Sequence, residues 1–281
     1  MCELFYKKLK DLCPIFVGIV GFIFTFFPFN NVDDITNIWN RLLLVVLLCA
    51  IFVAIVLAIT IFTRFFCSNQ LYRKEKTSIV FLYKSLKEII ADAPKNGSTI
   101  VVPINSFLPS AGDASMIRES SIHYQILEYL KNKGIIIDRK YIDSLSAKKI
   151  KMIDNDNCMI GDWFLVSTSD SHDKKSGLKF LFLVVGSLDM INGVPKVIPP
   201  TEFEYLGALQ SLCEAIPLEA DIEEKIYIPL IGAGNADVRK TSDIMRIIYE
   251  LLIFNKSLLR QHIYVFVNPK YKRETNIFEL N

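Results

Sequence analysis

Two glycines end a short apolar run in the second half of the chain, and their spacing points to anion binding. Residues 225–237 read KIYIPLIGAGNAD, so Gly232 and Gly234 lie one residue apart at the end of a strand-like segment. Glycine lacks a Cβ and reaches positive φ, which allows neighbouring backbone N–H groups to converge on an anion. A helical pattern follows, and helix N-termini attract negative charge. The segment predicts a strand that opens into a phosphate-sized loop.

A second strand-like segment also ends in polar residues. Residues 99–104 read TIVVPI and lead into Asn105, after which a loop rich in Ser, Gly and Asp continues to Glu119. Ligands of open α/β sheets collect at the carboxyl ends of strands. If these two strands are neighbours, their loops and two helix N-termini face one pocket suited to a diphosphate. The alternative is a tight turn without a ligand, because a lone Gly-x-Gly is a weak signal and the Rossmann and Walker patterns are absent.

From Thr77 onward, short apolar runs alternate with amphipathic helical patterns, as in an α/β domain. We expect about six strands in a mixed sheet that helices cover on both faces. The predicted strands are residues 78–82, 99–104, 163–168 and 179–185, a strand that ends at Leu230, and residues 262–267; the predicted helices are 84–91, 122–132, 138–145, 201–216 and 241–255. Ser121 and Thr201 are the expected caps of two of these helices.

The first 76 residues have a different character. No charged residue lies in residues 12–29 or in residues 42–63. As helices these stretches would be about 27 and 33 Å long, against a hydrocarbon core of about 30 Å. We therefore expect a transmembrane helical hairpin with a short linker in residues 1–76 and a separate domain in residues 77–281. The alternative for the first stretch is a secretory signal peptide, which its length and the lack of a small-residue cleavage site disfavour.

The charges outside the two apolar stretches predict an orientation. Basic residues precede the first stretch and follow the second, whereas the connector holds Asp33 and Asp34 with only Arg41 at its edge. Because basic loops stay in the cytoplasm, both termini should be cytoplasmic. Six cysteines without a Cys-x-x-Cys pair suit a reducing compartment and offer no metal site. A net charge of +2 gives no electrostatic footprint for nucleic acid.

Three segments together resemble a macro domain: residues 100–106 (IVVPINS), 120–126 (SSIHYQI) and 226–235 (IYIPLIGAGN). The chain is more narrowly similar to the membrane effector of type II Thoeris anti-phage systems, in which two membrane helices precede a divergent macro domain. The resemblance covers residues 78–281, and the hairpin extends it to nearly the whole chain. It implies a cytoplasmic three-layer α/β/α domain that the hairpin anchors to the bacterial inner membrane. The ligand of that domain is expected to be an ADP-ribose derivative such as histidine-ADP-ribose.

In that family, a partner TIR-domain enzyme makes the signal from NAD. Binding of the signal is expected to promote homo-oligomerisation and membrane disruption, which ends in abortive infection. The resemblance assigns Ile104, Asn105 and Ser106 to the distal ribose, and Ser121, Ile122 and His123 to the first phosphate side. It assigns Pro229, Leu230, Ile231, Gly232, Ala233, Gly234, Asn235, Ala236 and Asp237 to the second phosphate loop.

The chain also departs from the macro-domain pattern. Residues 81–84 (FLYK) replace the Gly-Asp pair that reads adenine, residues 109–115 replace the glycine-rich loop of ADP-ribosyl hydrolases, and Val102 stands where hydrolases place an asparagine. Hydrolysis requires an activated water near the distal ribose. We therefore expect a binding sensor without catalytic residues or a cofactor. The alternatives are a membrane-anchored ADP-ribosyl hydrolase or nucleotide phosphodiesterase, and an anchored scaffold with a vestigial pocket.

Overall fold

The structure is a computed structural model in which the chain forms two compact units, Met1–Ser68 with Asn281, and Asn69–Leu280. The second unit thus begins within the segment predicted as a linker. The residues described are 9–10, 12–18, 35–66, 69–74, 77–93, 96–107, 117–150, 157–168, 177–192, 194–220, 224–233, 240–255, 261–273 and 275.

The first unit contains one long helix, α2 (Ile35–Phe66), with exposed apolar side chains along it. Residues 12–18 are also helical, and the ring of Phe16 stacks on that of Phe52 with centroids 4.4 Å apart. Residues 19–29 of the first predicted span lie outside the described residues. Judged by length and hydropathy, none of the described helices qualifies as a membrane-crossing helix. The transmembrane hairpin stays a prediction.

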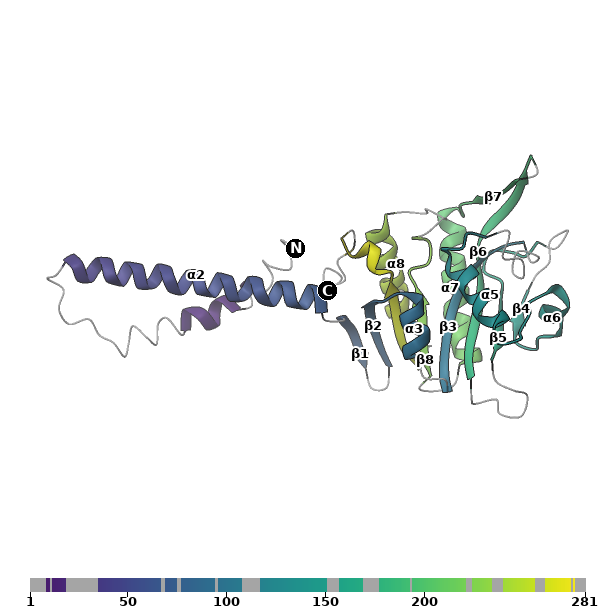
Figure 1. Ribbon diagram of the computed structural model, residues 1–281, viewed down its shortest axis with the longest axis horizontal. Coiled ribbons are helices and arrows are strands. Elements are labelled where there is room, and N and C mark those ends of the chain that lie inside the picture. The colour runs from purple at the N-terminus through teal and green to yellow at the C-terminus, as the bar shows by residue number, and fades with distance from the viewer. Residues whose placement is uncertain are drawn as a thin grey trace. The chain divides into compact units, whose positions relative to one another are not determined.

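The second unit is built on one nine-stranded mixed sheet (Figure 1). Its centre consists of five parallel strands in the order β2 (Thr77–Tyr83), β9 (His262–Val267), β8 (Lys225–Pro229), β3 (Asn96–Asn105) and β6 (Gly177–Ile191). Antiparallel strands lie outside this centre: β1 (Asn69–Lys74) beside β2, then β5 (Trp163–Ser167) and β4 (Lys148–Lys149) beyond β6. The far end of β6 pairs with β7 (Val194–Ile198), and this hairpin protrudes in Figure 1.

The predicted strands correspond to β2, β3, β5, β6, β8 and β9, and β5 and β6 pair as an antiparallel hairpin. The estimate of about six strands was wrong, because β1, β4 and β7 were missed. Each lacks the apolar pattern of a buried strand: β1 reads NQLYRK, β4 is two lysines, and β7 contains Pro195. Such short, polar strands belong to sheet edges, where one face or one side meets water.

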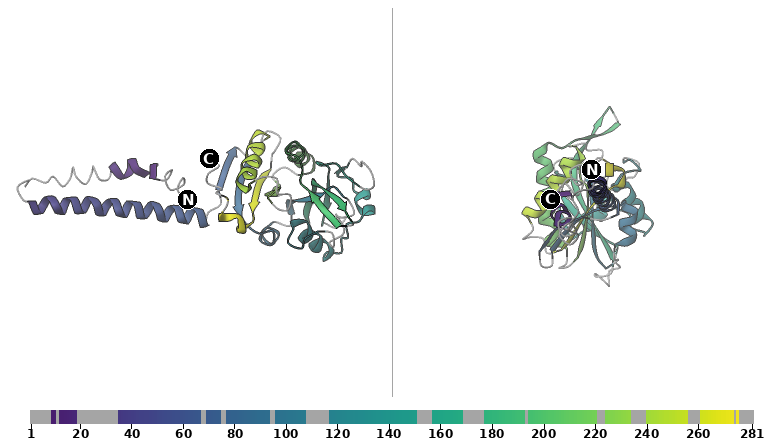
Figure 2. Two further views of the ribbon diagram at one scale, coloured as in Figure 1. Left: turned by 90° about the horizontal axis from the view of Figure 1, so that it is seen from above. Right: turned by 90° about the vertical axis from the view of Figure 1, so that its left-hand side faces the viewer.

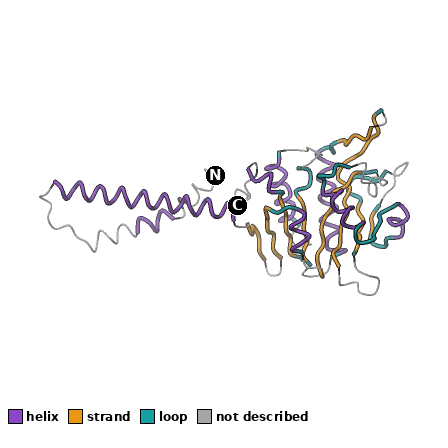
Figure 3. The backbone as a smooth tube through the Cα atoms, in the orientation of Figure 1, coloured by secondary structure: helices purple, strands orange, loops and turns teal. Residues whose placement is uncertain are grey.

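Helices cover both faces of the sheet, as Figures 2 and 3 show. One face packs against α7 (Glu202–Glu219) and α8 (Thr241–Phe254), and the other against α3 (Leu86–Asp92), α5 (Ile122–Lys131) and α6 (Arg139–Ser144); the 3-10 helix η2 (Pro269–Arg273) follows β9. Alternation along β3 separates the two cores, because Val101 belongs to the first and Ile100 and Val102 to the second. The predicted three-layer α/β/α arrangement is confirmed.

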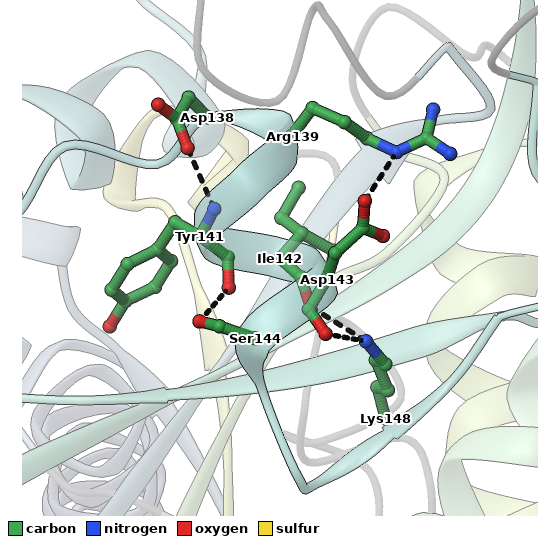
Figure 4. Close-up of polar contacts among 7 residues, drawn as sticks. All are labelled: Asp138, Arg139, Tyr141, Ile142, Asp143, Ser144 and Lys148. Atoms are coloured by element: carbon green, nitrogen blue, oxygen red, sulfur yellow. Dashed lines mark hydrogen bonds and ion pairs between the residues drawn. The ribbon is translucent and has the colours of Figure 1, made fainter.

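The two predicted helix caps, Ser121 and Thr201, are confirmed. The Ser121 hydroxyl accepts the backbone N–H of Tyr124 at 3.0 Å and begins α5. Thr201 and Glu204 form a reciprocal capping box that begins α7. Figure 4 shows α6, where the Asp138 carboxylate accepts the Tyr141 N–H at 2.7 Å.

At the other end of α6, the Lys148 ammonium donates to the carbonyl oxygens of Ile142 and Asp143 (Figure 4). A cation at this position opposes the negative end of the helix dipole. The two contacts tie this short helix to strand β4, which begins at Lys148.

Candidate functional site

A cavity of about 750 Å³ opens at the carboxyl ends of the parallel strands. Its wall includes the ends of β3, β8 and β9, the middle of β6, strand β7, the starts of α3 and α5, and the segments that follow β2 and β9. This is the position at which open α/β sheets bind ligands, because the connecting loops converge there. The volume is within the range of small-molecule and cofactor sites, about 300 to 1,000 Å³.

The structure brings together ten of the fifteen residues predicted to contact ligand. Those that line the cavity are Ile104, Asn105, Ser121, Ile122, His123, Pro229, Leu230, Ile231, Gly232 and Ala233. They meet because β3 and β8 are adjacent and parallel, with Thr99 opposite Ile226. The predicted pocket required these two strands to be neighbours, and they are. Gly234, Asn235, Ala236 and Asp237 lie outside the described residues.

Ser106 does not line the cavity, although it was predicted beside the distal ribose. Its side chain is buried, and its hydroxyl accepts the Leu188 N–H at 3.4 Å. Its backbone N–H donates to the Gly186 carbonyl at 2.8 Å, and its own carbonyl accepts the Cys158 N–H at 2.7 Å. Ser106 therefore joins the end of β3 to β6 and to residue 158. Of the two polar side chains at this strand end, Asn105 is the one that lines the cavity.

The first turn of α5 forms one part of the wall. The Ser121 hydroxyl satisfies the third N–H of the helix, whereas Ile122, as the first helical residue, has no intrahelical acceptor for its N–H. This end of the helix carries a partial positive charge and therefore favours an anion. The expected second helix start is not at the cavity among the described residues, since the wall includes neither Lys240 nor Thr241 of α8.

The glycine loop forms the opposite part of the wall as a tight turn. The Ala233 N–H donates to the Leu230 carbonyl at 3.3 Å, and Gly232 between them has a φ of 89°. A positive φ at the third position is the mark of a type II turn and favours glycine. Space is a second reason for glycine, because a Cβ on Gly232 would lie 3.1 Å from the ring of Tyr205.

Two tyrosines from different elements hold two carbonyl groups of this turn. The hydroxyl of Tyr205, on α7, donates to the carbonyl oxygen of Ile231 at 2.8 Å. The hydroxyl of Tyr271, in η2, donates to the carbonyl oxygen of Ala233 at the same distance. Burial raises the pKa of Tyr205 far above its usual value, so this phenol remains a donor at any physiological pH.

The charged residues that line the cavity are all cationic. Lys84 follows β2, Arg118 precedes α5, Lys196 lies on β7, and Lys270 lies in η2, and no Asp or Glu is among the described lining residues. Lys84 also pairs with Asp92 at 2.5 Å, and the Lys270 ammonium lies 4.6 Å from the ring centroid of Tyr271. A concave site with charge of one sign attracts ligands of the opposite sign. These four residues were missed by the sequence reasoning.

His123 is buried in the cavity wall, and its ring meets that of Phe182 edge to face at a centroid distance of 6.3 Å. A histidine base is usually oriented by a carboxylate, and the described lining residues supply none. Asn105 lies across from β6, with its Oδ1 4.0 Å from where a Cβ of Gly186 would be. The arrangement has the donors and cations of an anion-binding site and lacks, within the described wall, an acid–base pair.

Two further segments contribute lining residues that were not predicted from the sequence. The β6–β7 hairpin contributes Leu188, Lys196 and Val197, and the segment after β9 contributes Asn268, Lys270 and Tyr271. The second group had a usable signal, because Asn268 directly follows a predicted buried strand, as Asn105 does. The hairpin had none, since the sequence pattern ended β6 at Val185.

Comparisons with known proteins give distant structural similarity only. No protein-family model matches the chain, and no curated protein matches its sequence. Solved structures that are similar include a mutant of the Oceanobacillus iheyensis macrodomain with ADPR (TM-score 0.42, 12% identity, 73% of this chain and 92% of that chain) and the same organism's macrodomain with ADP (0.41, 11%, 73% and 90%). The Trypanosoma brucei macrodomain in complex with ADP-ribose has a TM-score of 0.37 at 9% identity, over 71% of this chain and 68% of that chain. Likenesses this distant do not bear on the ligand or activity of this chain.

Proposed function

We propose that the second unit binds ADP-ribose, or a derivative of it, with the diphosphate between the Gly232 turn and the start of α5. One observation carries the proposal: the cavity places a glycine turn and a helix N-terminus among four cations, with no carboxylate among its described lining residues. Backbone N–H groups and cations are the usual partners of phosphates. A described wall that contains no carboxylate does not repel a dianionic ligand.

The dimensions suit a ligand with groups on both sides of a diphosphate. The cavity extends from Lys84, which follows β2, to the middle of β6, where Gly186 pairs with Asn105, and so crosses five adjacent strands. At about 4.8 Å between strands this edge is about 19 Å long. The Gly232 turn follows β8 and Asn105 ends β3, so both lie in the middle strands and leave room on either side.

Binding without turnover fits this wall better than hydrolysis. Hydrolysis requires a water activated near the distal ribose, and the described lining residues, which include no Asp or Glu, offer His123 as the candidate base. Incubation of the full chain with ADP-ribosylated protein tests the alternative of an ADP-ribosyl hydrolase. Release of ADP-ribose above a heat-denatured control, abolished by His123→Gln, would favour the enzyme. Binding without release supports the sensor.

We extend the proposal to a membrane effector of bacterial anti-phage defence, on the resemblance to type II Thoeris systems. The signal would be histidine-ADP-ribose from a TIR-domain enzyme, and residues 12–29 and 42–63 would cross the inner membrane with both termini cytoplasmic. Support for the membrane part comes from α2, which carries no charged residue in 42–63 and exposes Leu43, Val46 and Phe62. Its Thr60 hydroxyl donates to the Val56 carbonyl at 2.7 Å, which satisfies that polar group without water.

Calorimetry on the full chain in detergent tests ligand binding. ADP-ribose should bind the wild type, and Gly232→Ala should weaken binding at least tenfold, because a Cβ there requires both a strained φ and displacement of the Tyr205 ring. Gly207→Ala is the matched control, since nothing lies within 4 Å of a Cβ at that position and Gly207 does not line the cavity. Absence of wild-type binding to ADP-ribose and its histidine conjugate would reject the proposal in favour of a scaffold.

The membrane part has its own test. The wild-type chain should stay in bacterial membranes during carbonate extraction, and Ile55→Arg should release a larger fraction, because a charge on an exposed α2 position disfavours insertion. In liposomes, histidine-ADP-ribose should cause dye leakage with the wild type and none with Gly232→Ala. Quantitative release by carbonate, or equal leakage with and without the ligand, would contradict an effector that acts on the membrane.

A further inference from the structure

The orientation of one peptide group decides whether the Gly232 turn attracts or repels an anion. In a trans peptide the C=O of one residue and the N–H of the next point in opposite directions. The Ile231 carbonyl accepts the Tyr205 hydroxyl at 2.8 Å, so the Gly232 N–H points away from Tyr205. Gly232 lines the cavity, and the described residues provide no acceptor for its N–H.

The same turn has an alternative state with the opposite polarity. Type I and type II turns differ by a flip of the central peptide, here the one between Ile231 and Gly232, and glycine permits both. After the flip, the Ile231 carbonyl oxygen would take the place of the Gly232 N–H, and a phosphate would meet a partial negative charge. The flip would also break the bond from Tyr205.

We propose that Tyr205 is a positioning residue that holds the Ile231–Gly232 peptide in its anion-binding orientation and thereby determines preference for diphosphate ligands. This inference rests on the proposed binding of ADP-ribose and deepens it. The ring of Tyr205 contributes as well as its hydroxyl, because its Cε2 would lie 3.1 Å from a Cβ at Gly232. The phenol therefore fills the space beneath the turn and donates to its carbonyl.

Tyr271 holds the carbonyl group of Ala233, the last residue of the turn, at 2.8 Å. Tyr205 lies on α7, which precedes β8, whereas Tyr271 lies in η2, which follows β9. Two elements that lie far apart in the sequence thus hold the turn. A preorganised donor binds more tightly than one that must first reorient.

The test compares hydroxyl deletion at Tyr205 with a matched control. In the full chain in detergent, Tyr205→Phe keeps the ring and should weaken ADP-ribose binding about five- to tenfold. The affinity for adenosine, which has no phosphate, should change less than about twofold. Tyr227→Phe removes another buried phenol hydroxyl from β8, one outside the cavity wall, and should change neither. Tyr271→Phe should weaken ADP-ribose binding to a smaller extent than Tyr205→Phe.

The outcomes separate this inference from the proposed function. If the wild type does not bind ADP-ribose, the proposed function fails. The positioning role alone is rejected if the wild type binds ADP-ribose and Tyr205→Phe binds it equally well. It is also rejected if Tyr205→Phe weakens the binding of adenosine by the same factor as that of ADP-ribose. Should Tyr205→Phe not fold, ¹⁵N-glycine labelling of the wild type decides: ADP-ribose must shift the Gly232 amide signal, identified by its loss in Gly232→Ala, and an unchanged signal overturns the inference.

Discussion

The ammonium of Lys84 lies 2.5 Å from the carboxylate of Asp92, at the edge of the cavity. Asp92 is the last residue of α3, where a negative charge is unfavourable next to the negative end of the helix dipole. Lys84 compensates for this, and its positive charge is shared between the helix end and the cavity. A ligand with phosphates therefore competes with Asp92 for Lys84.

Asp92→Asn should consequently strengthen the binding of ADP-ribose. Both side chains are partly exposed to solvent, so the effect is modest, about two- to threefold in affinity at low salt. Lys84→Met should weaken binding in the same assay. Calorimetry at two salt concentrations checks the cause, because an electrostatic gain shrinks as salt is added. An Asp92→Asn chain that binds more weakly than the wild type would show that Lys84 does not serve the ligand.

Charge reversal at the far side of the cavity gives a second prediction. Lys196→Glu, on β7, should lower the affinity for ADP-ribose about three- to tenfold, because it places a negative charge in an otherwise cationic wall. Lys140→Glu, on an exposed position of α6 outside the cavity, makes the same change in net charge and should leave affinity within twofold. Equal losses in the two variants would assign the effect to net charge and not to the β6–β7 hairpin.

The sequence predicted the strand ends at the site better than it predicted the site's charge. Asn105 and Gly232 follow buried apolar runs, and local signals of that kind identify strand ends without knowledge of the topology. Lys196 and Lys270 line the same cavity only because β7 pairs with β6 and because β9 lies between β2 and β8. Strand order is a tertiary property, and no local pattern contains it.

The helices were predicted more accurately than the edge strands for a related reason. Ser121, Asp138 and Thr201 each satisfy backbone N–H groups within their own helix, so the signal is local. The strand β1 is held by pairing with β2 across a bulge between Gln70 and Tyr72, and its polar sequence gives no periodic pattern. Its existence depends on a neighbouring strand that supplies the hydrogen bonds.

A buried ion pair at the opposite edge of the sheet predicts a stability effect. The Glu224 carboxylate is fully buried. It accepts hydrogen bonds from the Thr99 hydroxyl and, at 3.0 Å, from the Lys179 ammonium. Lys179→Met leaves the carboxylate without its cation and should lower the free energy of unfolding by about 3 to 5 kcal/mol. A double variant that also carries Glu224→Gln should recover part of the lost free energy of unfolding, because it has no buried charge at this position.

Fluorescence-monitored urea unfolding checks this pair. The chain has two tryptophans, Trp39 in α2 and Trp163 in β5, so a Trp39→Phe background reports on the second unit alone. A double variant less stable than Lys179→Met would mean that Glu224 contributes through Thr99 more than through the ion pair.

The capping box of α7 predicts how stability changes with pH. Hydrogen bonds from the hydroxyl and backbone N–H of Thr201 lower the pKa of Glu204 below its usual 4.5. A lowered folded-state pKa stabilises the fold at pH values above 4.5, and this contribution disappears as pH falls through the folded-state pKa. Glu204→Gln should therefore melt at a lower temperature than the wild type at pH 7, and the difference should narrow below pH 4.5. If the difference in melting temperature stays constant down to about pH 3, roughly one unit below the usual pKa of glutamate, the charge of Glu204 does not contribute to stability.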